Sequence, residues 1–149
     1  MAKILDRKQS VFELKEMFYN ADRYIYLICP YIDLTKDNYI TKGLEYACKK
    51  GIDINIIYSK GFNNKREGIE HIKKYSRVKL CYIADLHMKV YLSDKSAIVG
   101  SLNLHDFSIK NNLECGILLE SREELWRDVY NMIKRDIYKN MIVEKKRNK

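Results

Sequence analysis

The feature that most limits the fold of this chain is the alternation of short apolar runs with longer helical stretches. Three near-continuous apolar runs, 23–29, 52–58 and 78–83, are each about as long as a buried strand. Stretches with helical periodicity lie between them. Strands that are apolar on both faces need helices above and below, because each face must be covered. The pattern therefore predicts an α/β fold in which a mixed β-sheet is sandwiched between helices.

Local signals place the ends of the helices. Expected helices cover residues 10–21, 36–50, 65–75 and a closing stretch that begins at 121. Ser10 with Glu13, and Ser121 with Glu124, have the spacing of capping boxes. Gly51 is expected to end the second helix. The closing helix has one apolar stripe, made of Leu125, Val129, Ile133, Ile137 and Met141.

The chain is expected to form one domain over residues 1–149. Of its 149 residues 46% are hydrophobic, and it has a single proline and no linker or internal repeat. No stretch approaches the roughly eighteen apolar residues of a membrane span, and the N-terminus has no apolar leader. These features predict a cytoplasmic protein without stable membrane association. The basic end, 143–149, is expected to be a frayed, solvated tail.

Thiol and metal chemistry find little support in the sequence. The four cysteines, Cys29, Cys48, Cys81 and Cys115, are far apart and lack the spacing of a metal-ligand pair. Three of them lie in apolar runs, so buried thiols are expected. The sequence contains neither a phosphate-binding glycine loop nor a cluster of aspartates. We therefore predict no cofactor and no metal site.

The residues most typical of an active site lie between 87 and 103. His87, Lys89 and Asp94 form H-x-K-x-x-x-x-D, and Ser101 and Asn103 form G-S-x-N. A neutral imidazole can attack phosphorus, and a lysine ammonium can lie against phosphate oxygens. Serine and asparagine add hydrogen-bond donors that stabilise the charge of a phosphoryl group during transfer. The cluster therefore predicts a phosphodiester-cleaving site.

Strand parity predicts how these side chains are arranged. His87, Lys89 and Tyr91 are two residues apart, so we expect them on the cleft-facing side of one strand, with its other face in the core. The next apolar strand ends just before Ser101, which brings that residue beside the histidine and lysine. Asp94 has the opposite parity, and we expect it to be a structural acceptor at the strand end.

This pattern resembles the motif of the phospholipase D superfamily, in particular its small, single-motif endonuclease-like members from bacteria and phages. A third element of that motif, N-x-E, occurs at 112–114. The resemblance implies that His87 is the nucleophile or, in a partner chain, the general acid. It implies that Glu114 orients the histidine ring. The implied phosphate-binding residues are Lys89, Ser101 and Asn103.

The motif occurs only once, although the chemistry that the resemblance implies uses two histidines. The second histidine must then come from another copy of the chain. We therefore predict a homodimer with one active site at its interface, on a two-fold axis.

Charge suggests the kind of substrate. The net charge of +8 favours an anionic partner. Lys60, Lys65 and Arg66 surround a Gly/Asn-rich stretch with Phe62, which could follow a phosphate backbone and stack on a base. A solvated loop is the alternative, and anionic lipid would be attracted by the same charge. His105 stands where superfamily members often have threonine, so it is a candidate for substrate contact.

The sequence as a whole predicts a metal-independent phosphodiesterase that hydrolyses DNA or RNA through a phosphohistidine. Three alternatives stay open at this point. The first is a phospholipase or phosphatidyltransferase acting on lipid, and the second is a non-catalytic nucleic-acid-binding module. The third is a nuclease domain that works within a larger restriction or repair assembly.

Overall fold

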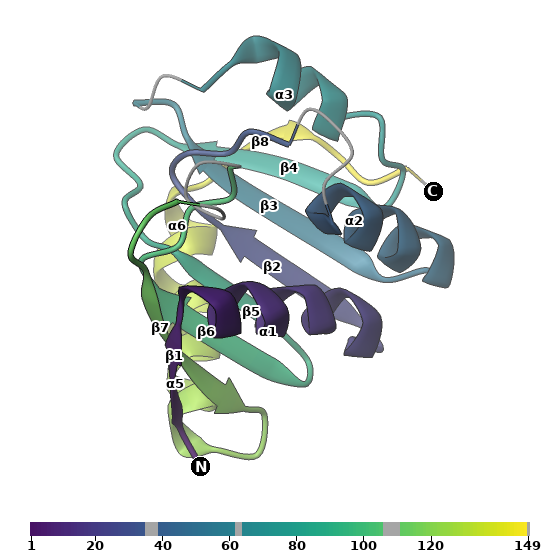
Figure 1. Cartoon of the computed structure of the whole chain (residues 1–149). Helices are drawn as coiled ribbons and strands as arrows, with labels where there is room; N and C mark the ends of the chain where they lie inside the picture. The colour runs from purple at the N-terminus through teal and green to yellow at the C-terminus, as the bar shows by residue number, and fades with distance from the viewer. Residues whose placement is uncertain (35–38, 62–63, 106–110, 149) are drawn as a thin grey trace.

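The centre of the molecule is one eight-stranded mixed sheet (Figure 1). The structure, a computed structural model, describes residues 1–34, 39–61, 64–105 and 111–148. The strands are β1 (Lys3–Asp6), β2 (Tyr24–Ile28), β3 (Asp53–Ser59), β4 (Val78–Ile83), β5 (Val90–Ser93), β6 (Ser96–Gly100), β7 (Cys115–Glu120) and β8 (Ile142–Lys145). Their order is β1-β7-β6-β5-β2-β3-β4-β8, and only the β2–β3 and β3–β4 pairs are parallel. The predicted α/β class with a mixed sheet is confirmed.

Helices cover both faces of this sheet (Figure 1). One face carries α1 (Arg7–Asn20), α2 (Tyr39–Lys50) and α3 (Arg66–Ile72); the other carries α5 (Glu124–Met132), the π-helix η1 (Ile133–Ile137) and α6 (Tyr138–Asn140). Tyr91 packs in the core on the first face, whereas Val90 and Leu92 pack in the core on the second. Strand β5 is therefore buried on both sides, and the prediction that Tyr91 lines a cleft is wrong.

The first helix begins earlier than the sequence predicts. Its capping box consists of Asp6, whose carboxylate accepts from Gln9 N (2.8 Å), and Gln9, whose side chain accepts from Asp6 N (2.9 Å). Ser10 lies inside the helix and is buried. The predicted Ser10 cap is wrong because the helix already begins at Arg7, where it is capped by Asp6 at the end of a strand that the sequence did not reveal. Gly51, with φ of 85°, ends α2 as predicted.

The closing helix also differs from its prediction. Glu123, and not Ser121, is the N-cap residue of α5. The helix passes through the π-turn η1 and ends at Asn140, so Met141 lies beyond it. The stripe residues Ile133 and Ile137 are buried against the sheet as expected.

The described part of the basic end is not frayed. Residues 142–145 form β8, which pairs antiparallel with β4. Lys145 Nζ donates to the carbonyl oxygens of Tyr75 (2.7 Å) and Val78 (2.8 Å), and Arg147 donates to the carbonyl oxygen of Ile54 (3.0 Å). The predicted tail is wrong because these long basic side chains satisfy backbone carbonyls while their charge stays near water.

The topology gathers several strand ends at one end of the sheet, which we call the carboxyl end. The parallel strands β2, β3 and β4 finish there. Val90, the first residue of β5, pairs with Ile28, the last of β2. Val99 pairs with Val90, and Gly116 pairs with Gly100. The carboxyl end is therefore where β5 begins, β6 ends and β7 begins.

Candidate active site

The predicted catalytic residues meet at the carboxyl end of the sheet. His87 and Lys89 lie in the segment that enters β5, Ser101 follows β6, and Glu114 precedes β7. His87 and Lys89 therefore precede the strand in which parity placed them. Lys89 Nζ donates to the carbonyl oxygen of His87 (3.3 Å). The backbone amide of Gly100 donates to the carbonyl oxygen of Lys89 (3.3 Å). Backbone pairing thus holds the lysine against the end of β6.

Ser101 links two of the three motif elements. Its hydroxyl donates to the Glu114 carboxylate and accepts from Cys115 N (3.1 Å). Ser101 N donates to the carbonyl oxygen of Cys115 (3.0 Å). The preceding Gly100 is required for this close approach, because a Cβ there would clash with the same carbonyl oxygen. The G-S-x-N and N-x-E elements are therefore fixed against one another.

Two buried side chains, whose part in the site the sequence analysis missed, support Asn103. The Cys29 thiol lies 3.2 Å from Asn103 Oδ1 and 3.1 Å from the carbonyl oxygen of Tyr31. Burial raises the pKa of Cys29, so the thiol stays protonated and can donate. The Tyr91 hydroxyl donates to the carbonyl oxygen of Leu102. With its oxygen toward Cys29, the Asn103 amide presents its nitrogen, a donor, on the opposite side.

The segment after β2 lies along the segment after β6. Ile32 forms an isolated parallel bridge with Leu104, and Asp33 N donates to the carbonyl oxygen of Leu104 (2.9 Å). The rings of Tyr31 and His105 meet edge to face, with centroids 4.6 Å apart. Both aromatic side chains therefore stand beside the G-S-x-N element, and one of them is His105, the candidate for substrate contact.

Asp94 lies at the other end of β5. Its side chain is 5% exposed, and Oδ1 accepts from the backbone amides of Asp22 (3.1 Å) and Arg23 (3.3 Å). The carboxylate thus joins the β5–β6 turn to the start of β2. This is the structural placement that its parity predicts.

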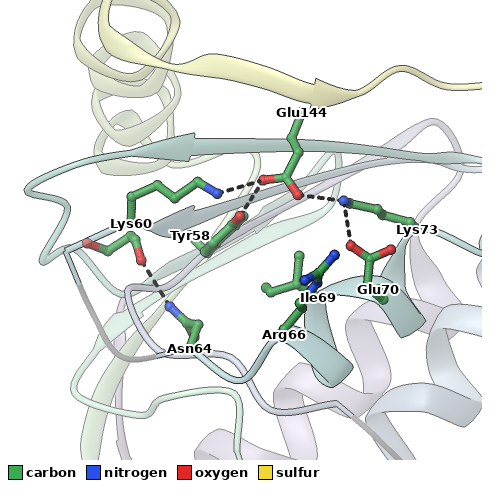
Figure 2. A pocket seen from close by; sticks show the side chains of 9 residues that line it. Tyr58, Lys60, Asn64, Arg66, Ile69, Glu70, Lys73 and Glu144 are labelled. Atoms are coloured by element: carbon green, nitrogen blue, oxygen red, sulfur yellow. Dashed lines mark hydrogen bonds and ion pairs between the residues drawn. The ribbon is translucent and has the colours of Figure 1, made fainter.

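The three basic residues expected to contact nucleic acid differ in their surroundings. Lys60 pairs with Glu144 (3.5 Å), and Lys65 pairs with Asp33 (3.7 Å). Arg66 lines a hollow of about 330 Å³ and has no ion-pair partner among the described residues (Figure 2). Phe62, their predicted aromatic neighbour, lies outside the described residues.

Glu144 is the acidic centre of that hollow (Figure 2). Its carboxylate accepts from the Tyr58 hydroxyl and pairs with Lys73 (2.8 Å) as well as Lys60. Burial raises the pKa of Glu144, but the hydrogen bonds from Lys73 and Tyr58 outweigh burial and hold the pKa below its ordinary value. Glu144 is therefore a charged counter-ion, and Arg66 is the cation of this hollow most open to an outside anion.

Within the described ranges, no group of three or more His, Cys, Asp and Glu side chains is arranged to hold a metal ion. Nor is any helix in those ranges long and apolar enough to cross a bilayer. The groups that the site does bring together are an imidazole, an ammonium, a hydroxyl, an amide and a carboxylate. That set can bind a phosphate through its donors, and its imidazole can attack phosphorus.

A sequence profile of the family described as "Cardiolipin synthase, PLD-like domain" matches residues 14–145. This match spans most of the chain and includes every motif residue. The chain therefore belongs to the phospholipase D-like family. A search of curated proteins found no match.

Solved structures support the same fold for this phospholipase D-like domain. NucT from Helicobacter pylori is 16% identical, with a TM-score of 0.82, and the match covers 96% of this chain and 98% of that one. Nuc from Salmonella typhimurium, a phospholipase D family member, is 17% identical, with a TM-score of 0.78, and the coverage is 98% and 100%. Phosphatidylserine synthase from Haemophilus influenzae is 14% identical, with a TM-score of 0.73, and the coverage is 97% and 40%. At these identities the similarity shows the fold alone.

Proposed function

We propose that this phospholipase D-like domain is a metal-independent nuclease that hydrolyses phosphodiester bonds of DNA or RNA. The observation that carries the proposal is the meeting of His87, Lys89, Ser101, Asn103 and Glu114 at one end of the sheet. The basic charge of +8 favours a polyanionic substrate. The matches to Nuc and NucT cover those two chains almost completely, so this chain is of about their length, which supports the proposal.

The proposed reaction has two displacement steps. In the first, an imidazole nitrogen of His87 attacks phosphorus, and a P–N bond forms as the P–O bond to the leaving nucleoside breaks. The imidazolium of His87 of the partner subunit gives its proton to the leaving oxygen. In the second, water attacks the phosphohistidine, the same second imidazole takes the proton of that water, and the P–N bond breaks. The donors of Lys89, Ser101 and Asn103 stabilise the negative charge on the phosphoryl oxygens.

A homodimer is part of this proposal. The described residues of one chain contain one H-x-K-x-x-x-x-D segment, while the two-step reaction needs a nucleophile and a separate acid. A two-fold axis at the carboxyl end would set two copies of His87 on opposite sides of one phosphorus atom. The fold match to phosphatidylserine synthase covers only 40% of that longer chain, which leaves room there for a second such unit.

Phosphatidyl transfer is the second candidate function. It is favoured by the fold match to phosphatidylserine synthase and by the family description, which names cardiolipin synthase. Both functions would use the same phosphohistidine chemistry at the same residues. Substrate tests do separate them, because a lipid enzyme would turn over vesicles and leave polynucleotides intact.

The test of the proposed function is an assay on labelled single- and double-stranded DNA and RNA in excess EDTA. We expect cleavage of at least one polynucleotide without added metal, because the proposed nucleophile is a side chain and not a metal-bound water. Vesicles that contain anionic phospholipid serve as the parallel substrate. Turnover of lipid alone, or cleavage that EDTA stops, would contradict the proposal.

Arg66 should contribute to nucleic-acid binding more than its basic neighbours do. In the His87→Ala background, which prevents cleavage, Arg66→Ala should weaken binding of a single-stranded oligonucleotide and lower the slope of log K against log salt by about 1. Lys65→Ala should have a smaller effect because Lys65 is already paired with Asp33. Arg122→Ala is the control for the loss of one positive charge, since Arg122, which pairs with Glu120 (2.7 Å), is exposed and lies beyond the far end of β7. Equal effects of Arg66→Ala and Arg122→Ala would show that only overall charge matters.

A further inference from the structure

A second hollow, which we call the His87 hollow, lies directly beside the candidate nucleophile. It has a volume of about 510 Å³ and lies among the 83–88 segment, η1, α6 and β8. His87 itself forms part of its wall. A volume of this order is typical of sites that hold a small organic group. Any group bonded to a phosphorus atom at His87 would lie next to this space.

The walls of the His87 hollow are mainly apolar. Ile83, Met88, Ile137 and Ile142 line it, and Ile142 is 55% exposed on the edge strand β8. An apolar surface of this kind gains free energy when a flat, uncharged ring covers it, because that ring removes it from water. A sugar or glycerol unit alone would leave most of this apolar surface exposed to water.

The polar atoms of the His87 hollow are mostly acceptors. Asp85 contributes a carboxylate, and the Asp136 carboxylate, which also lines the hollow, accepts from Arg135 Nε (2.9 Å) and Nη2 (3.0 Å). Asn140 Nδ2 donates to the carbonyl oxygen of Asp136 (2.6 Å), which fixes this amide and leaves its oxygen as an acceptor. The Asp85 carboxylate disfavours an anion in the hollow, so the phosphate belongs with Lys89 and Ser101. Acceptors at the rim of an apolar hollow suit the amino and imino groups of nucleobases.

We propose that the His87 hollow binds the nucleobase of the nucleotide attached to the scissile phosphate. This inference rests on the proposed function and names the part of the substrate that distinguishes a polynucleotide from a phospholipid. The hollow also lies on the π-turn η1, and such turns frequently occur at functional sites. The phosphate and its neighbouring base would then be held on two sides of one imidazole.

The test compares ligands with and without a base. Nucleoside monophosphates should bind the wild-type protein roughly 5- to 10-fold tighter than ribose phosphate or glycerol phosphate, since one base contact is worth about 1 kcal/mol or more. Titration calorimetry gives these ratios with no need for turnover. Equal affinity of nucleoside monophosphates and ribose phosphate would overturn the inference.

Ile142→Trp should abolish that preference. Tryptophan is tolerated in strands, and at this exposed position its ring would fill the hollow. Binding of inorganic phosphate should be unchanged. Val143→Trp is the matched control, because Val143 is 41% exposed on the same strand and does not line the hollow. If both variants bound nucleoside monophosphates alike, the inference would be wrong. Light scattering checks that both variants keep the oligomeric state of the wild type.

Failure of the inference and failure of the proposed function give different results. Polynucleotide hydrolysis in EDTA together with equal binding of all phosphate ligands would overturn the base site and leave the nuclease intact. A protein that turned over lipid and bound glycerol phosphate best would overturn both. Base-dependent binding without any hydrolysis would support the hollow and contradict the nuclease.

Discussion

Replacement of His87 by alanine is expected to lower polynucleotide hydrolysis by at least about 1,000-fold, as removal of a covalent nucleophile does in other hydrolases. His87 is exposed and precedes β5, so the substitution leaves no buried cavity. The melting temperature should therefore stay within about two degrees of the wild-type value. Initial rates in EDTA and a thermal scan measure both quantities.

His71→Ala is the matched control for this experiment. It removes another imidazole from the same protein, but His71 lies on α3, where its ring contacts Tyr75 edge to face. The hydrolysis rate of the His71→Ala variant should stay within about two-fold of wild type. Activity retained by His87→Ala would contradict the assignment of the nucleophile. If that variant bound nucleic acid normally and the wild type showed no hydrolysis, the protein would be a non-catalytic binding module.

Mixing His87→Ala with wild-type subunits tests whether the site is shared. If one site needs His87 from both chains, only pairs of wild-type subunits are active. After full exchange, an equal mixture should then keep roughly a quarter of the wild-type activity, as random pairing in a two-fold dimer requires. Independent sites would keep roughly half, and that result would contradict the shared cleft. Activity of a strictly monomeric protein would contradict it as well.

The sequence predicted the parts of the site that depend on residue type and strand order. Ser101 was expected beside His87 and Lys89 because the apolar runs around them predict neighbouring strands, and Glu114 was expected there from the superfamily resemblance. The structure does bring all four residues to one end of the sheet. The assignment of catalytic roles to these residues stays a prediction. A phosphate-binding site can be predicted from a sequence when the required groups lie close together along the chain.

The supporting residues were harder to predict because their partners are distant in sequence. Cys29 lies in an apolar run and therefore looks like an ordinary core thiol in the sequence. The pairing of β2 with β5 brings it beneath Asn103. One signal was available, since Cys29 directly precedes Pro30 at the end of an apolar strand. Residues at such strand ends in α/β proteins commonly face a site.

The wrong predictions have a common physical cause, which is that short local patterns compete. Asp6 and Ser10 can each cap a helix, and only the pairing of β1 with β7 decides for Asp6. The charge of residues 143–149 suggested a solvated tail, yet Lys145 and Arg147 are long enough to reach backbone carbonyls while β8 covers the edge of β4. Tertiary contacts outweighed local preference in both cases.

The Asp94 carboxylate should matter for stability and not for catalysis. Asp94→Ala would leave the backbone amides of Asp22 and Arg23 without their acceptor in a place where the side chain is only 5% exposed. Hydrogen bonds to a charged acceptor contribute about 1.5–3 kcal/mol each, so the free energy of unfolding should fall by about 3 kcal/mol. The pair with the Arg23 guanidinium adds little, because that side chain is 74% exposed. Urea denaturation gives the loss directly.

The catalytic part of this prediction follows from the position of Asp94 along β5. It lies four residues beyond Val90, where the strand enters the carboxyl end, and therefore roughly 13 Å from the site. The rate per folded molecule should stay within about two-fold of wild type at a temperature where the variant is folded. Asp94→Asn keeps one oxygen acceptor without the charge, so it should lose about half as much stability. A fully stable Asp94→Ala protein with a rate that falls as far as that of His87→Ala would place Asp94 in the reaction and remove its structural role.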